Sequence, residues 1–202
     1  MRNEKLENFK EKMNGKNVAI IGMGVSNKPL LKYLYDLKCN ITVFDKREEE
    51  KIDSDIFETI RELNIKYSIG ANYLNKLHGF DIIIRSPSCR PDLPEIKEEI
   101  KNGAQLTSEI ELLFKLAPCK IVAVTGSDGK TTTTTLIYNI LKEKYNCYLG
   151  GNLGNPLFTK IDEMQPNDII VLELSSFQLM TMKQSPDIAV ITNITPNHLD
   201  IH

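Results

Sequence analysis

The 202-residue sequence lacks the features that mark membrane, secreted and repetitive proteins. No apolar run approaches the ~18 residues that a membrane-spanning helix requires. Residues 1–13 are rich in charge and contain no apolar core of the kind that a secretory signal peptide has. Low-complexity tracts and repeats of about 20–50 residues are also missing. Together these absences predict a cytoplasmic protein that does not bind membranes.

An excess of charge of one sign is missing as well. The chain has 25 basic and 27 acidic residues and a net charge of -2, so its composition does not indicate nucleic acid as a partner. No Cys-x-x-Cys pair occurs among the four cysteines, which are Cys39, Cys89, Cys119 and Cys147. This spacing argues against a structural zinc site or a disulfide framework and favours reduced thiols.

What the sequence does contain is organised around one stretch, residues 121–132. It begins with a short β-branched apolar run, which is typical of a parallel strand covered on both faces. Gly126 and Gly129 allow a tight turn that exposes backbone N–H groups, and a helical pattern follows. Such a loop at a helix N-terminus can hold a polyphosphate.

Two side chains strengthen the phosphate-loop interpretation. Lys130 would bring a positive charge to the outer phosphates, and the hydroxyl of Thr131 could bind the accompanying magnesium. The loop is a shortened relative of the P-loop pattern, because Val124 stands where the early glycine would be. The alternative is an ordinary turn with a solvated lysine.

The first part of the chain contains a βαβ pattern with its own glycine loop. A strand over residues 17–21 leads into Gly22-Met23-Gly24, and a second strand over residues 41–44 ends at Asp45. Asp45 lies 21 positions after Gly24, where a dinucleotide-binding protein places its ribose-binding acid. However, Asn27 replaces the third glycine of that fingerprint. An NAD site and a turn without a ligand therefore both remain alternatives.

Strand and helix patterns alternate along the whole chain, which predicts an α/β fold. We expect a Rossmann-like domain with a parallel sheet over residues 1–106, and a P-loop-type α/β domain over residues 107–202. Ligands of open parallel sheets bind beyond the carboxyl ends of the strands. Ser26, the turn 45–47 and Ser86 follow such ends, so we expect them to share one crevice.

Three polar residues of the second part also follow predicted strands. Asn152 lies in a glycine-rich turn, and Glu173 follows the strand predicted over residues 168–172, where a carboxylate could hold magnesium. His198 comes just after the last predicted strand and is a candidate catalytic or metal-binding residue. The alternatives are that Asn152 lies in a plain loop, that Glu173 is a charge at the end of a strand, and that His198 is solvated.

Taken together, these motifs resemble the Mur ligase family, the ATP-dependent enzymes that form amide bonds in peptidoglycan precursor synthesis. The resemblance rests on four segments that occur in the same order, namely 125–132, 151–154, 172–179 and 193–200. The third segment contains the most selective motif, Ser-Ser-Phe-Gln-Leu. It is strongest to the member that adds D-glutamate to UDP-N-acetylmuramoyl-L-alanine.

The resemblance implies ATP and Mg2+ as cofactors and assigns roles by matching position. Catalytic roles fall on Lys130 and His198. The implied metal ligands are Thr131, Glu173 and His198. The implied ATP-binding residues are Gly126, Ser127, Asp128, Gly129, Lys130, Thr131 and Thr132. The implied residues for the UDP substrate are Ser26, Asp45, Lys46, Arg47, Ser86 and Asn152.

The implied reaction has two steps. A substrate carboxylate attacks the γ-phosphate of ATP to give an acyl phosphate, and the amine of D-glutamate then displaces phosphate. Both steps bring anions together, so magnesium, Lys130 and the loop amides would offset the repulsion. We expect a monomer that serves cell-wall synthesis, and hence cell shape and division.

The family enzymes are longer than this chain, and their separate C-terminal domain carries the D-glutamate site. We therefore expect a central domain that is incomplete at its C-terminal side, no C-terminal ligase domain, and no turnover by these residues alone. Ser88 stands where the family has a glycine, and Lys46 is the least typical of the matched residues. A UDP-sugar or nucleotide-binding module without catalysis, and a sister ligase that adds another amino acid, are the alternatives.

Overall fold

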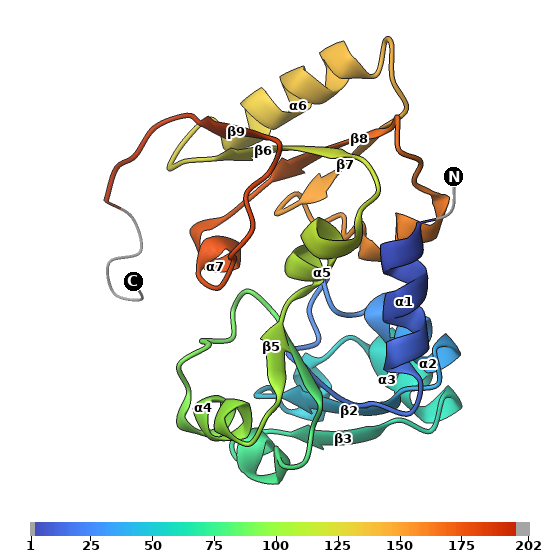
Figure 1. The fold of residues 1–202 in the computed structure, drawn as a ribbon. Helices are drawn as coiled ribbons and strands as arrows, with labels where there is room; N and C mark the ends of the chain where they lie inside the picture. Colours follow the sequence, from blue (N-terminus) through green and yellow to red (C-terminus); the bar gives the residue numbers. More distant parts are fainter. Residues whose placement is uncertain (1–2, 197–202) are drawn as a thin grey trace. The chain divides into compact units, whose positions relative to one another are not determined.

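The structure is a computed structural model that describes residues 3–196 (Figure 1). The chain divides into an N-terminal unit, which ends at Leu112, and a second unit, which begins at Leu113. Strands and helices alternate in both units, and all strand pairs are parallel, which confirms the predicted α/β class. His198 lies outside the described residues, so its predicted role is untested. No helix in residues 3–196 is long and apolar enough to cross a membrane.

The N-terminal unit contains a five-stranded sheet of order β3-β2-β1-β4-β5. This order reverses beside the first strand, as in doubly wound Rossmann-like folds, and the ligand crevice of such folds lies at the reversal. The strands are β1 (Asn17–Ile21), β2 (Asn40–Asp45), β3 (Lys66–Ile69), β4 (Ile82–Arg85) and β5 (Gln105–Thr107). The helices are α1 (Glu4–Met13), α2 (Leu30–Asp36), η1 (Glu49–Lys51), α3 (Ser54–Glu62), η2 (Tyr73–Lys76) and α4 (Pro94–Lys101).

The register of the central strands explains why polar residues meet at one edge. Ile21, the last residue of β1, is opposite Phe44 of β2 and Arg85 of β4. The three strands therefore end at the same level, because parallel pairing aligns their carboxyl ends. Asp45, at the end of β2, and Gly22 and Ser86, which follow β1 and β4, therefore lie at the same edge of the sheet.

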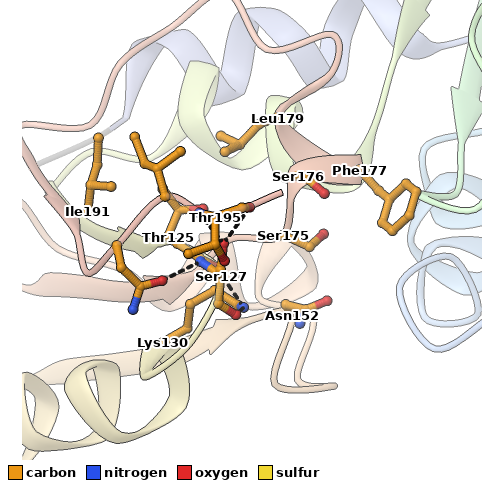
Figure 2. A pocket seen from close by; sticks show the side chains of 13 residues that line it. Thr125, Ser127, Lys130, Asn152, Ser175, Ser176, Phe177, Leu179, Ile191 and Thr195 are labelled. Carbon is orange, nitrogen blue, oxygen red and sulfur yellow. Dashed lines mark hydrogen bonds between the residues drawn. The ribbon is translucent and has the colours of Figure 1, made fainter. Parts of the chain in front are cut away.

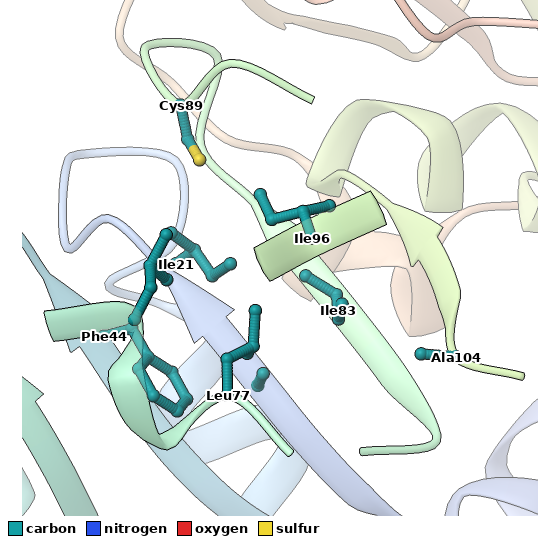
Figure 3. Close-up of a cluster of buried hydrophobic side chains, with 9 residues drawn as sticks. Ile21, Phe44, Leu77, Ile83, Cys89, Ile96 and Ala104 are labelled. Carbon is teal, nitrogen blue, oxygen red and sulfur yellow. The ribbon is translucent and has the colours of Figure 1, made fainter. Parts of the chain in front are cut away.

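A cluster of buried apolar side chains packs on one face of this sheet (Figure 3). Ile21, Phe44 and Ile83 contribute from the strands, and Ile96 contributes from α4. Phe44 also packs edge-on against Phe80, with the ring centroids 5.5 Å apart. Burial of these side chains holds the strands in register, and hence the loops that follow them.

The second unit contains a four-stranded sheet of order β7-β8-β6-β9. Its longest helix, α6 (Lys130–Leu141), runs along the sheet and contacts β6, β7 and β8 (Figure 1). The strands are β6 (Lys120–Thr125), β7 (Cys147–Gly151), β8 (Ile169–Glu173) and β9 (Ile188–Ile191). The remaining short helices are η3 (Phe158–Glu163) and α7 (Ser176–Leu179), and α5 (Glu109–Leu116) spans the division between the units.

Most predicted elements occur within a few residues of their expected positions, with two instructive differences. The apolar run from Phe80 forms a strand only from Ile82, because the N–H of Phe80 donates to Glu99 at 2.7 Å instead of to the sheet. The helix predicted after the phosphate loop begins at Lys130, directly after a left-handed Gly129. The sequence does not indicate this first residue clearly, because the run of threonines is β-branched and such residues favour helices weakly.

Candidate functional site

The phosphate loop lies between β6 and α6, where the sequence predicted it. Gly126 and Gly129 have φ values of +138° and +78°, in the range that favours glycine. A Cβ atom on Gly126 would overlap the side chain of Thr192, so a larger residue does not fit there. The first turn of α6 carries N–H groups that have no partner within the helix, which makes this end suitable for an anion.

Lys130 folds back over this loop. Its Nζ donates to the carbonyl oxygens of Gly126 at 2.8 Å and Ser127 at 2.9 Å. Figure 2 shows the Lys130 side chain lying close to Ser127. The ammonium group is thus held at the mouth of the loop, where phosphate oxygens could replace the two carbonyl partners.

Glu173 is hydrogen-bonded to two other predicted site residues. It is the last residue of β8, is 3% exposed, and pairs in register with Val124 and Gly151. Its Oε2 accepts a hydrogen bond from the hydroxyl of Thr131 at 2.7 Å, and its Oε1 accepts one from the amide of Asn152 at 2.8 Å. The structure therefore brings the phosphate loop, the glycine-rich turn and the acid together.

The oxygen atoms of Glu173 and Thr131 fit a magnesium ion that accompanies a nucleotide. Magnesium prefers hard oxygen ligands and usually binds proteins through one or two carboxylates, with water and substrate phosphates completing its shell. The carboxylate and hydroxyl are within hydrogen-bonding distance of each other, so one small cation could contact both. Their roles as metal ligands remain predictions.

A cavity of about 520 Å³ lies next to the phosphate loop (Figure 2). Its polar wall comes from the loop and Asn152, and its apolar wall from the segments around α7 and β9. The lining residues are Thr125, Gly126, Ser127, Lys130, Asn152, Ser175, Ser176, Phe177, Leu179, Ile191, Asn193, Ile194 and Thr195. The cavity thus contains Lys130 and Asn152, two residues singled out in the sequence.

The Ser-Ser-Phe-Gln-Leu motif forms a capped turn at this cavity. The hydroxyl of Ser175 accepts from the backbone N–H of Gln178 at 3.3 Å, and the side-chain oxygen of Gln178 accepts from the N–H of Ser175 at 2.9 Å. This reciprocal capping box begins α7. It holds Ser176 and Phe177, which lie between the two capping residues, at the cavity wall.

A second cavity, of about 260 Å³, lies at the carboxyl ends of the strands of the N-terminal unit. Four of the predicted substrate-binding residues line it, namely Asp45, Lys46, Arg47 and Ser86. Ser26, the fifth candidate in this unit, belongs to the same glycine loop but does not line the cavity. The other lining residues are Ile21, Gly22, Met23, Gly24, Tyr73, Ser88 and Cys89.

Asp45 is engaged in holding Arg47 and the glycine loop. Its Oδ2 accepts from the N–H of Met23 at 2.7 Å and from Arg47 Nη2 at 2.8 Å, and its Oδ1 accepts from Arg47 Nε at 3.0 Å. Arg47 Nη2 also donates to the carbonyl of Met23 at 2.8 Å. Both carboxylate oxygens are therefore used, which disfavours the alternative in which Asp45 binds the ribose of NAD.

Burial and hydrogen bonding act on this ion pair in opposite directions. Burial would raise the pKa of Asp45, but the hydrogen bonds from Arg47 and the amide of Met23 lower that pKa below its ordinary value. The hydrogen bond to Asp45 in turn raises the pKa of Arg47. The pair is thus charged at neutral pH, and its partly exposed guanidinium offers a cation at the cavity.

Gly22 allows Ser86 to approach the glycine loop closely. Gly22 has φ +84°, and a Cβ atom on it would overlap the hydroxyl of Ser86. The hydroxyl of Ser88 lies 3.0 Å from that of Ser86. Positive φ occurs at only two non-glycine residues of the described chain, Lys38 and Asn64, so the backbone at Ser88 does not require a glycine.

Sequence reasoning missed several residues of both cavities. Tyr73 lines the N-terminal cavity, and burial raises its pKa to about 12. Asn193 and Thr195 lie in the segment 193–200, but the sequence predicted no role for them. Their position just after a predicted strand was the available signal, since strand ends meet at one edge.

Two family models match the chain. The Mur ligase MurD-like, N-terminal domain matches residues 16–108, and the Mur ligase middle domain matches residues 124–202. These ranges contain the two cavities, one in each match.

Several similar proteins carry the name UDP-N-acetylmuramoylalanine–D-glutamate ligase. The protein of Ruminiclostridium cellulolyticum is 57% identical over 201 residues, and that of Acetivibrio thermocellus is 55% identical over 201 residues. Each match covers 99% of this chain and 43% of the relative. A Clostridium botulinum relative is 51% identical over 195 residues, with 96% and 42% covered. The chain thus spans less than half the length of these relatives.

Solved structures show the same fold at low sequence identity. The UDP-N-acetylmuramate:L-alanyl-gamma-D-glutamyl-meso-diaminopimelate ligase from Neisseria meningitides matches with a TM-score of 0.54 and 17% identity, over 93% of this chain and 63% of that chain. A murein peptide ligase from Psychrobacter arcticus gives 0.50 and 18%, over 92% and 44%. Both support the two-unit α/β architecture.

Proposed function

The chain belongs to the Mur ligase family, and we propose that it supplies the UDP-substrate site and the ATP site of a ligase that joins D-glutamate to UDP-N-acetylmuramoyl-L-alanine. The observation that carries this proposal is the convergence on Glu173. Its carboxylate accepts from Thr131 of the phosphate loop and from Asn152 of the glycine-rich turn, and Asn152 lines the same cavity as Lys130.

In the proposed first step, these residues bring a substrate carboxylate up to the γ-phosphate of ATP. Lys130 would exchange its two loop carbonyls for phosphate oxygens, and the free amides of the first turn of α6 would bind others. Magnesium held by Glu173 and Thr131 would withdraw charge from the phosphates. Positioning and charge compensation are the main contributions that proteins make to phosphoryl transfer.

In the N-terminal unit, we propose that the cavity around Arg47 takes the UDP part of the substrate. Arg47 is fixed by Asp45 and by the carbonyl of Met23, so its planar cation is oriented before a ligand arrives. Guanidinium groups suit phosphate oxygens because they can donate two parallel hydrogen bonds. The hydroxyls of Ser86 and Ser88 add polar contacts on the same wall.

The same observations explain why the two sites need different ligands. The N-terminal loop lacks the lysine and threonine that follow Gly129 in the second unit, and the described part of the second unit shows no counterpart of the Asp45–Arg47 pair at its loop. We infer a cytoplasmic location, because the proposed reaction consumes ATP.

Calorimetric titration of the chain tests this proposal. We expect saturable binding of UDP-N-acetylmuramoyl-L-alanine that Arg47→Ala weakens at least tenfold, and saturable binding of Mg-ATP that Lys130→Ala weakens at least tenfold. Each variant serves as the control for the other ligand. Binding of NAD in place of the UDP compound would overturn the proposed substrate site.

A further inference from the structure

The segment that follows β9 is hydrogen-bonded to the phosphate loop along most of its length. Asn193, Thr192 and Thr195 make these contacts, although 64 or more positions separate them from the loop in sequence. The N–H of Thr192 continues the strand pairing to the carbonyl of Thr125 at 3.0 Å. The loop is thus joined to β9 as well as to β6 and α6.

The carboxamide of Asn193 pairs with the loop backbone through both of its ends. Its Oδ1 accepts from the N–H groups of Ser127 at 3.1 Å and Asp128 at 3.0 Å, and its Nδ2 donates to the carbonyl of Asp128 at 3.2 Å. The N–H of Ser127 is also 3.2 Å from the backbone oxygen of Asn193. No other common side chain of this length offers an acceptor and a donor in one plane except aspartic acid in its protonated form.

Two threonines complete the attachment. The hydroxyl of Thr192 donates to the carbonyl of Asp128 at 2.6 Å, and the hydroxyl of Ser127 donates to the carbonyl of Thr195 at 3.0 Å. The N–H of Thr195 returns a bond to the Ser127 hydroxyl at 2.9 Å. Gly126 must be glycine because this segment approaches it so closely.

These bonds divide the groups of the loop into two sets. The N–H groups of Ser127 and Asp128 are used by Asn193, whereas those at the start of α6 have no partner within the helix. The carbonyl of Asp128 receives two donors from the segment, so it is held toward β9. A carbonyl oxygen that faced a polyphosphate would repel it.

We propose that Asn193, assisted by Thr192, is a positioning residue for the phosphate loop. It fixes the Ser127–Asp128 peptide so that the amides of the following helix turn, together with Lys130, are directed at the phosphates. Asn193 acts through the loop and does not itself contact the reacting atoms. The inference deepens the proposed function and rests on it, because it presupposes that the loop binds Mg-ATP.

The first test compares the Mg-ATP affinity of variants of the chain by calorimetry. We expect Asn193→Ala to weaken binding about tenfold, which corresponds to about 1.4 kcal/mol. Thr192→Val, which keeps the shape but loses the hydroxyl, is expected to weaken binding by about threefold to fivefold, and Thr192→Ser is expected to restore it. Asn146→Ala is the matched control, because Asn146 is an exposed asparagine of the same unit whose side chain reaches only Tyr148, at 3.5 Å.

The affinity for UDP-N-acetylmuramoyl-L-alanine is measured on the same variants. A variant in which the whole chain fails to fold would lose both ligands. Loss of the second unit alone is recognised by urea unfolding of that unit, which a positioning effect leaves close to that of Asn146→Ala. Should Asn193→Ala fold poorly, the Thr192→Val and Thr192→Ser pair carries the comparison, since serine keeps the hydrogen bond. Tighter Mg-ATP binding by Asn193→Ala would overturn the proposal, because it would mean that the carboxamide competes with phosphate for the two amides. Unchanged affinity would overturn it as well.

A second measurement separates this inference from the proposed function. Amide hydrogen exchange is followed by NMR without nucleotide, for which the structure requires slow exchange at Ser127 and Asp128 and at least tenfold faster exchange in Asn193→Ala. Fast exchange at both amides in the unmodified chain would refute the attachment itself. Slow exchange combined with no Mg-ATP binding would refute the proposed function of the loop, and the positioning role with it, while the attachment stands.

Discussion

Gly151→Ala is expected to disrupt the acid site, whereas Gly154→Ala in the same turn is expected to leave it intact. The two glycines have similar positive φ values, +85° and +78°. They differ in their surroundings, because a Cβ atom on Gly151 would overlap the backbone carbonyl of Glu173, and a Cβ atom on Gly154 would meet nothing within 4 Å. The pair therefore isolates the effect of close approach between β7 and β8 from the effect of backbone strain.

The expected magnitudes follow from this difference. Placing alanine in the left-handed region costs about 1–2 kcal/mol, and the smaller entropy of the unfolded chain offsets roughly 0.4–1 kcal/mol of that. Gly154→Ala should thus lower the free energy of unfolding by about 1 kcal/mol. Gly151→Ala should also break the two bonds between Asn152 and Glu173, each 2.8 Å long. Since each loss leaves a buried acceptor worth roughly 1–2 kcal/mol, the total is about 3–5 kcal/mol.

Hydrogen exchange with mass spectrometric detection, in increasing urea, gives the stability of the peptides that contain β6 and β8. The same samples are titrated with Mg-ATP, whose binding should be lost in Gly151→Ala and retained in Gly154→Ala. If the two variants were destabilised equally, within about 0.5 kcal/mol, close contact between Gly151 and Glu173 would not control this site. The reasoning would then be refuted.

Two further predictions concern ionisable groups. The Asp45–Arg47 pair should stabilise the N-terminal unit fully above about pH 4, because the pKa of Asp45 is lowered from its ordinary value of 3.8, and this contribution should disappear as the pH falls through the lowered value. Asp45→Asn should therefore be less stable at pH 7 and show a shallower loss of stability in acid, as measured by urea unfolding between pH 2 and 7; an unchanged acid slope would contradict this. Burial raises the pKa of three thiols to about 11, so iodoacetamide at pH 8 should label the native chain much more slowly than the urea-unfolded chain at Cys39, Cys89 and Cys119. Equal labelling rates in mass spectra would count against their burial.

Strand ends were predictable because they depend on local pattern and one general property of parallel sheets. Apolar β-branched runs marked β6 and β8, and parallel pairing then required the residues after them to share an edge. The sequence therefore predicts that Thr131 and Glu173 lie near one another, and the structure confirms that these two side chains are hydrogen-bonded. The fold class was predictable for the same reason.

Side-chain partners were not predictable, because they depend on register between distant segments. Asp45 was expected to face a ligand, but it receives hydrogen bonds from Arg47 and the amide of Met23. Asn152 was expected to contact the substrate, and its amide donates to Glu173 instead. Neither arrangement excludes a ligand contact, but both depend on distances that the sequence does not contain.

Short elements were missed for a different reason. Four residues of α7 and six of η3 are too few to produce a helical periodicity. The signal for α7 was its capping box, in which Ser175 precedes Gln178 by three positions. A capping box can therefore indicate a helix that is too short to show an apolar repeat.

The central claim is that two nucleotide ligands bind to two separate units of this chain. The most direct test is NMR titration of backbone amides with UDP-N-acetylmuramoyl-L-alanine and then with Mg-ATP. We expect the first ligand to shift the amides of residues 22–26, 45–47 and 86–88, and the second to shift those of residues 126–132 and 173. Failure of the first ligand to shift residues 45–47, failure of the second to shift residues 126–132, or shifts of residues 22–24 by NAD alone, would contradict this assignment.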